Sequence, residues 1–164
     1  MDYQTDAMAQ SEQVGTRWKL MFSCWLVAML ATLGSLFFSE VMGLVPCELC
    51  WYQRIFMFPL AVILLVALHP LDTCVVRYAL PTAIIGLLFT LYHGLLFYGL
   101  IPESMQPCRQ GISCADDSMV LFGLVPIPLL SLLAFATIIV LLLKIRALAN
   151  TDLKNDSLKP GNTL

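Results

Sequence analysis

The sequence has 164 residues, of which 59% are hydrophobic and 12% charged, with a mean hydropathy of +0.83 and a formal net charge of -2. A soluble domain normally carries about a quarter charged residues, so part of this surface is expected to face lipid. The net charge is slightly negative, and the sequence has no basic patch that could neutralise phosphate groups, so nothing in it indicates a nucleic-acid-binding protein.

Four apolar stretches are predicted to form membrane-spanning helices. In chain order they cover about residues 20–38, 51–68, 78–101 and 119–143. A hydrocarbon core roughly 30 Å thick needs about 20 helical residues, so the second stretch spans only if Trp51 to Arg54 belong to it. Each stretch is apolar nearly all the way round, as expected for a helix between lipid and a thin bundle interior. The sequence therefore predicts an all-α membrane protein, a four-transmembrane-helix bundle over residues 18–146.

The orientation follows from the basic residues. Seven of the nine Lys and Arg residues lie in the two terminal segments and in the link at 69–77, and the other two are Arg54 and Arg109. The positive-inside rule then places both termini in the cytoplasm and the two remaining short loops outside it. The polar tails, 1–17 and 147–164, lack periodicity and are expected to be disordered or frayed ends.

A C-x-x-C motif, Cys47 to Cys50, lies in the first outward loop, with Pro46 before it and an apolar helix after it. At a helix start, unpaired backbone N–H groups and the positive helix end stabilise a thiolate. The spacing also lets the two sulfurs close a small, reducible ring, which favours thiol–disulfide exchange. The alternatives are a static disulfide or a zinc site completed by Cys108 and Cys114. We expect no metal.

The second outward loop carries Cys108 and Cys114, separated by five residues that include a glycine. This loop can bend to join the sulfurs, and Arg109 would favour the Cys108 thiolate. A disulfide that only pins the loop is the alternative. Two dithiol pairs on one membrane face can pass a disulfide between them. Cys24, within the first helix, and Cys74, in the cytoplasmic link, are expected to stay reduced and outside this relay.

Disulfide exchange only moves oxidation between sulfurs, so two electrons need an acceptor. The sequence has no GxGxxG-type loop and no spare length for a nucleotide domain, which favours a quinone dissolved in the bilayer. Arg54 shares a helix face with Cys50 and could stabilise charge on its sulfur and on a quinone oxygen; the alternative is an interfacial snorkelling arginine. His93, an ionisable residue inside a span, is a functional candidate or a neutral hydrogen-bonded histidine. A metal-handling protein with four outward thiols, or a reductase that sends electrons outward, stays open.

The segment Val45–Ile55, with the sequence VPCELCWYQRI, closely resembles the disulfide bond formation protein B (DsbB) family, especially its short-loop BdbC-like branch. The resemblance extends from about Trp18 to Leu143. It implies a bacterial inner-membrane protein whose redox loops face the periplasm or cell exterior. Such a protein reoxidises a thioredoxin-fold thiol oxidase, DsbA-like or BdbD-like, and passes electrons to ubiquinone or menaquinone. Arg54 matches the family's quinone-associated arginine, and His93 matches a histidine implicated at the same site.

The resemblance also implies a role for each outward cysteine. Cys50 would contact the quinone, and Cys47 would exchange with the second loop. Cys108 would form the mixed disulfide with the partner, with Cys114 as its counterpart. The better-known branch has a much longer second loop between its last two cysteines, whereas five residues separate Cys108 and Cys114, so the resemblance leaves the detailed order of exchange and the identity of the partner open.

Overall fold

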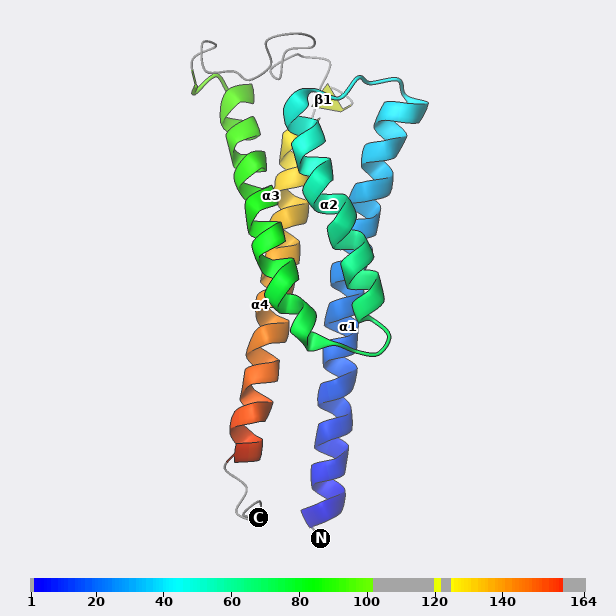
Figure 1. Ribbon diagram of the computed structural model, residues 1–164, viewed down its shortest axis with the longest axis vertical. Helices are drawn as coiled ribbons and strands as arrows, with labels where there is room; N and C mark the ends of the chain where they lie inside the picture. The colour runs from blue at the N-terminus through cyan, green and yellow to red at the C-terminus, as the bar shows by residue number, and fades with distance from the viewer. Residues whose placement is uncertain (1, 102–119, 122–124, 158–164) are drawn as a thin grey trace.

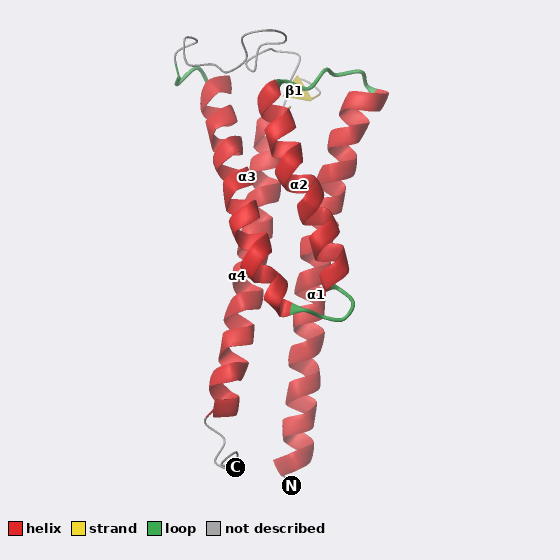
Figure 2. Cartoon of the chain, in the orientation of Figure 1, coloured by secondary structure: helices red, strands yellow, loops and turns green. Residues whose placement is uncertain are grey.

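Helices account for nearly all of the computed structural model, which describes residues 2–101, 120–121 and 125–157 (Figures 1 and 2). The helices in chain order are α1 (Asp2–Leu36), the π-helix η1 (Phe37–Val41), α2 (Glu48–Ala67), the 3-10 helix η2 (Thr73–Val75), α3 (Val76–Phe97) and α4 (Ile127–Ser157). Two short strands, β1 (Val120–Leu121) and β2 (Val125–Pro126), pair antiparallel. Within these described ranges, four helices are long and apolar enough to cross a membrane, which confirms the predicted fold class.

The four long helices form an up-and-down bundle. Each packs against the next one in the chain, and α4 closes the bundle against α1. The start of α1 and the end of α4 therefore lie at the same end of the bundle, while the start of α2 lies at the other end (Figure 1). The C-x-x-C motif is thus at the end remote from the termini. That this end faces away from the cytoplasm stays a prediction.

One helix boundary meets the length condition set by the sequence, and two others differ from those predicted. α2 begins at Glu48, so the residues from Trp51 to Arg54 do belong to the second span. α3 ends at Phe97, four residues earlier than expected, and Gly99 follows with a φ of +69°, a left-handed conformation that suits glycine. The prediction that the fourth helix begins near 119 was wrong, because α4 starts at Ile127. Pro128 then lies in the first turn, where its missing N–H costs nothing.

The two tails contain more helix than expected. The prediction that they are disordered was wrong where the structure describes them, because α1 begins at Asp2 and α4 continues to Ser157. Extending a helix costs far less than nucleating one, and α1 contains no proline to stop it. Arg17 and Asp152 form an ion pair that joins α1 to α4 toward the ends of the chain.

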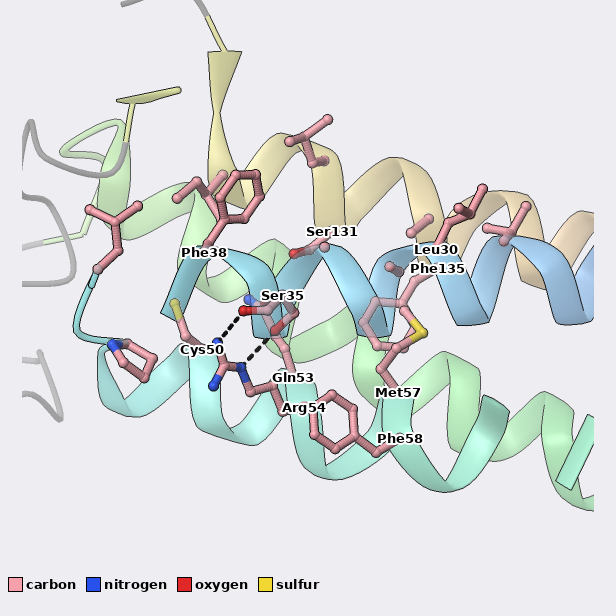
Figure 3. Close-up of a pocket in the computed structure, with 18 of the residues that line it drawn as sticks. Leu30, Ser35, Phe38, Cys50, Gln53, Arg54, Met57, Phe58, Ser131 and Phe135 are labelled. Carbon is pink, nitrogen blue, oxygen red and sulfur yellow. Dashed lines mark hydrogen bonds between the residues drawn. The ribbon is translucent and has the colours of Figure 1, made fainter. Parts of the chain in front are cut away.

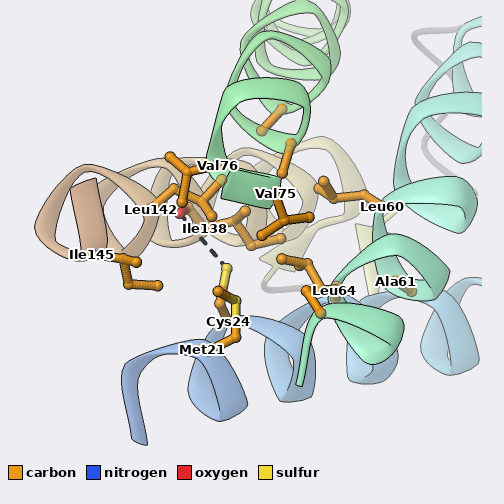
Figure 4. Close-up of a cluster of buried hydrophobic side chains, with 14 of the residues drawn as sticks. Met21, Cys24, Leu60, Ala61, Leu64, Val75, Val76, Ile138, Leu142 and Ile145 are labelled. Carbon is orange, nitrogen blue, oxygen red and sulfur yellow. Dashed lines mark hydrogen bonds between the residues drawn. The ribbon is translucent and has the colours of Figure 1, made fainter. Parts of the chain in front are cut away.

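The core lies between the four helices and is thin. Figure 4 shows the part of the core around Cys24, where side chains from α1, α2 and α4 contact the segment that begins α3. Cys24 is fully buried there, as expected of an apolar core residue, and Cys74 is exposed. Between α3 and α4, the ring of Phe135 lies directly over Gly86: a Cβ on this glycine would be 2.3 Å from a ring carbon. Most other span residues point outward, as a lipid-facing surface requires.

Candidate active site

The first turn of α2 brings the two sulfurs of the C-x-x-C motif together. Cys47 is the N-cap residue, and its Sγ accepts a hydrogen bond from the backbone N–H of Cys50 at 3.4 Å. The two Sγ atoms are 3.1 Å apart, a contact between reduced sulfurs rather than a bond of about 2.05 Å. The predicted position of the first sulfur, at an unpaired backbone N–H of a helix start, is confirmed.

Helix α3 contributes His93, which is fully buried and faces Cys47. Its Nε2 lies 3.8 Å from the Cys47 Sγ, and its Nδ1 lies 3.0 Å from the side-chain amide nitrogen of Gln53. Gln53 follows Cys50 by three residues and so shares its side of α2. Among residues whose side chains are described, the buried polar ones are Gln53, Thr90 and His93. Two of these three therefore adjoin the motif.

This environment acts on the acidity of Cys47, which precedes the membrane-spanning part of α2. The thiol of Cys50 donates a hydrogen bond to the Cys47 sulfur and, with smaller contributions from His93 and the Cys50 backbone N–H, holds the pKa of Cys47 well below its usual range, although burial opposes this. In the reduced pair, Cys47 is therefore the thiolate and Cys50 the proton donor.

A pocket of about 410 Å³ lies between α1, α2 and α4, and Cys50 is in its wall (Figure 3). The walls are mainly apolar and include Leu30, Phe38, Met57, Phe58, Leu130 and Phe135. Polar groups come from Arg54 and Gln53 on α2, Ser35 on α1 and Ser131 on α4. The pocket thus combines a largely hydrocarbon lining with a few polar groups near one redox sulfur, as is usual for small-molecule sites.

Arg54 is held in this wall by α1. Its Nε donates to the Ser35 hydroxyl and its Nη2 to the Ser35 carbonyl, both at 2.6 Å (Figure 3). Its Cζ lies 5.4 Å from the centre of the Trp51 ring. These contacts hold the guanidinium against α1 in the wall of the pocket. η1 begins two residues after Ser35, and a π-helical turn often marks a functional site.

The two sulfurs border different surroundings. Cys47 packs toward α3, beside His93, whereas Cys50 faces the pocket on the side of α1 and α4. Among the described residues, those that line the pocket include Gln53, which thus touches both sides, and do not include His93. The predicted contact of His93 with a quinone therefore stays a prediction. Cys108, Arg109 and Cys114 lie outside the described residues.

Two features of this site were not predicted from the sequence. Gln53 could have been suspected, since it follows Cys50 by three residues on a helix. Ser35 carried no comparable signal, because its contact with Arg54 depends on how α1 is rotated against α2. The structure also groups Cys47, Cys50 and His93, whose ligand atoms all lie within 4.8 Å of one another, as a set able to hold a metal ion.

Comparisons with known proteins agree on one family. The family model described as disulfide bond formation protein DsbB matches residues 16–145. A probable disulfide formation protein of Metapseudomonas resinovorans is 52% identical over 133 residues, which cover 80% of this chain and 92% of that protein. Disulfide bond formation protein C of Bacillus subtilis (strain 168) is 44% identical, covering 73% of this chain and 87% of that protein. No solved structure gives a significant match.

Proposed function

Because the chain belongs to the DsbB family of disulfide bond formation proteins, multi-pass proteins of the inner membrane, we propose that it is a thiol:quinone oxidoreductase. In this proposal, it reoxidises a thioredoxin-fold thiol oxidase, DsbA-like or BdbD-like, on the extracytoplasmic side. The electrons pass through Cys108–Cys114 and Cys47–Cys50 to a ubiquinone or menaquinone.

One observation carries the quinone half of this proposal: Cys50 and Arg54 lie in the wall of the same apolar pocket. The volume of about 410 Å³ is within the usual range of roughly 300–1,000 Å³ for small-molecule sites. A quinone ring needs apolar walls and a few polar groups for its oxygens, and these residues supply both. The residues present therefore fit a quinone.

The two cysteine pairs would act one after the other, by disulfide exchange. A partner dithiol reduces the Cys108–Cys114 disulfide and is itself oxidised, and the resulting dithiol reduces the Cys47–Cys50 disulfide in the same way. A bound quinone would supply the acceptor for the two electrons and two protons that leave the Cys47–Cys50 dithiol as its disulfide re-forms. Cys47 holds the negative charge of the reduced pair beside His93.

Arg54 would act on the pocket side. Its guanidinium donates two hydrogen bonds to Ser35 on α1, which hold it in the wall of the pocket that Cys50 also lines. A preoriented cation in a site with little water stabilises developing charge without first having to reorganise.

The experiment is a quinone-reduction assay with the purified full-length protein. A reduced thioredoxin-fold oxidase serves as electron donor, and a short-chain ubiquinone or menaquinone is followed by its absorbance. We expect Cys47→Ser and Cys50→Ser to abolish quinone reduction and Cys24→Ser, at a buried sulfur outside the site, to retain it. Quinone reduction that survives either substitution in the C-x-x-C motif would refute the proposal.

The direction of electron flow has its own measurement. With quinol and oxidised partner supplied instead, a disulfide reductase would generate partner thiols, which a thiol reagent counts. We expect no net formation of partner thiols in this mixture, because the proposed flow runs from partner thiols to quinone. Net formation of thiols from quinol would favour the reductase.

A further inference from the structure

We propose that Cys47, Cys50 and His93 of the reduced protein form a three-ligand site for a soft divalent cation of the zinc type, which the disulfide form of the protein cannot bind. The two sulfurs come from the start of α2 and the imidazole from α3, and all three ligand atoms lie within 4.8 Å of one another. This set differs from a four-thiol site, because it requires neither Cys108 nor Cys114.

The distances are close to those a tetrahedral ion requires. With Zn–S of about 2.3 Å and Zn–N of about 2.0–2.1 Å, tetrahedral angles separate two sulfurs by about 3.8 Å and a sulfur from a nitrogen by about 3.5 Å. In the structure, the sulfurs are 3.1 Å apart, and His93 Nε2 is 3.8 Å from the Cys47 Sγ. The third pair, Cys50 Sγ and the His93 nitrogen, lies within 4.8 Å, so shifts of about 1 Å, within reach of cysteine side-chain rotation, would form the site.

Gln53 supplies the outer partner that a metal-binding histidine usually has. Its side-chain amide is 3.0 Å from His93 Nδ1, on the ring edge away from the sulfurs. In the structure the amide nitrogen faces Nδ1; once the amide rotates so that its oxygen faces this nitrogen, the oxygen accepts the Nδ1 proton and leaves the Nε2 lone pair facing Cys47. Gln53 is only 6% exposed, so its amide group stays beside the imidazole in either orientation.

The chemistry of the donor set selects the cation. Two thiolates and an imidazole suit Zn²⁺ or Cd²⁺, whereas Mg²⁺ and Ca²⁺ require oxygen ligands that this set lacks. The two thiolates balance the charge of the ion, and the nearby Arg54 already directs its guanidinium to Ser35. Cys50 borders the pocket, so a fourth, exogenous ligand and the entry path would be on that side.

Binding and oxidation would exclude each other. A divalent cation binds the Cys47 thiolate, displaces the one remaining thiol proton from Cys50 and leaves both sulfurs reduced, whereas disulfide formation joins the same sulfurs and removes both thiolates. The cation would therefore stall the protein only in its reduced state and would have no effect on the disulfide form. This inference concerns the reduced dithiol and does not depend on which molecule accepts the electrons.

The test is a Cd²⁺ titration of the full-length, anaerobically reduced protein in which Cys74, Cys108 and Cys114 are replaced by serine. The near-ultraviolet sulfur-to-cadmium charge-transfer band reports binding. We expect one Cd²⁺ per protein when the remaining motif is reduced and none when it is oxidised. His93→Ala should weaken binding at least tenfold, and Gln53→Ala should weaken it about 10–100-fold, as loss of an outer partner usually does.

Thr90→Val is the matched control. Thr90 is buried on α3 like His93, but its hydroxyl donates to the Gly86 carbonyl of its own helix. We expect it to leave Cd²⁺ affinity unchanged, and circular dichroism checks that each variant is folded. His93→Gln, which keeps a polar side chain of similar size, guards against misfolding of the alanine variant. If folded His93→Ala or His93→Gln protein binds Cd²⁺ within threefold of the parent, ordinary dithiol chelation explains the binding and the proposal fails.

A metal-free control separates this proposal from the proposed function. With a chelator present, quinone reduction by the wild-type protein measures the proposed function alone. If the protein binds Cd²⁺ as expected but does not reduce quinone, only the proposed function is overturned. If it reduces quinone but His93→Ala leaves Cd²⁺ binding unchanged, only the metal site is overturned.

Discussion

Ser35→Ala should slow quinone reduction, although Ser35 lies on a different helix from the C-x-x-C motif. The substitution removes the hydroxyl that accepts from Arg54 Nε at 2.6 Å and leaves the backbone carbonyl that accepts from Nη2. A hydrogen bond to a charged group contributes about 1.5–3 kcal/mol. Because one of the two bonds survives, we expect a loss near the lower limit, which is about a tenfold decrease in kcat/KM for the quinone.

The assay varies the quinone at saturating partner and then the partner at saturating quinone. Ser35→Ala should lower kcat/KM for the quinone and leave kcat/KM for the partner thiols nearly unchanged. Ser23→Ala is the control, because Ser23 is exposed on α1 and its hydroxyl donates to the Lys19 carbonyl. A change of less than twofold for the quinone, or an equal loss for both substrates, would show that anchoring of Arg54 by α1 does not serve the pocket.

Two further predictions concern packing and acidity. Gly86→Ala should destabilise the protein by about 1–3 kcal/mol, because the added Cβ would lie 2.3 Å from the Phe135 ring. Thermal unfolding in detergent measures this loss. Gly94→Ala is the control, because a Cβ at Gly94 would meet open space. In reduced, chelator-treated protein, Cys47 should stay reactive toward a small alkylating reagent well below the pH at which ordinary thiols lose reactivity. Its lowered pKa keeps the thiolate as pH falls, so His93→Ala should shift the pH profile of the alkylation rate upward; an unshifted profile would contradict a contribution from His93.

The sequence predicted the parts of the site that depend on local geometry. Cys47 could be placed at a helix start because Pro46 and an apolar run surround the motif, and the N-cap contact confirms that placement. The helical repeat put Arg54 on the same face as Cys50, and both line one pocket. Such relations need only the rise and turn of one helix.

Contacts between helices could not be predicted in the same way. The approach of His93 and Gln53 depends on the rotation of α3 against α2, and the spans are too uniformly apolar for a hydrophobic stripe to fix that rotation. The start of α4 was misplaced for a different reason. Hydrophobicity continues back to Met119, but Pro126 and Pro128 restrict where the helix begins.

The division of surroundings between the two sulfurs has a kinetic consequence. Cys47 is next to α3 and Cys50 is in the wall of the pocket, so a thiol donor and a lipid-soluble oxidant would approach different atoms of one bond. Neither reactant then needs to leave before the other binds, and saturation with one should not compete with the other. The Cys47–Cys50 disulfide would then carry electrons from a thiol donor that reacts at one sulfur to a lipid-soluble oxidant that reacts at the other. The two reactants would not need to contact each other.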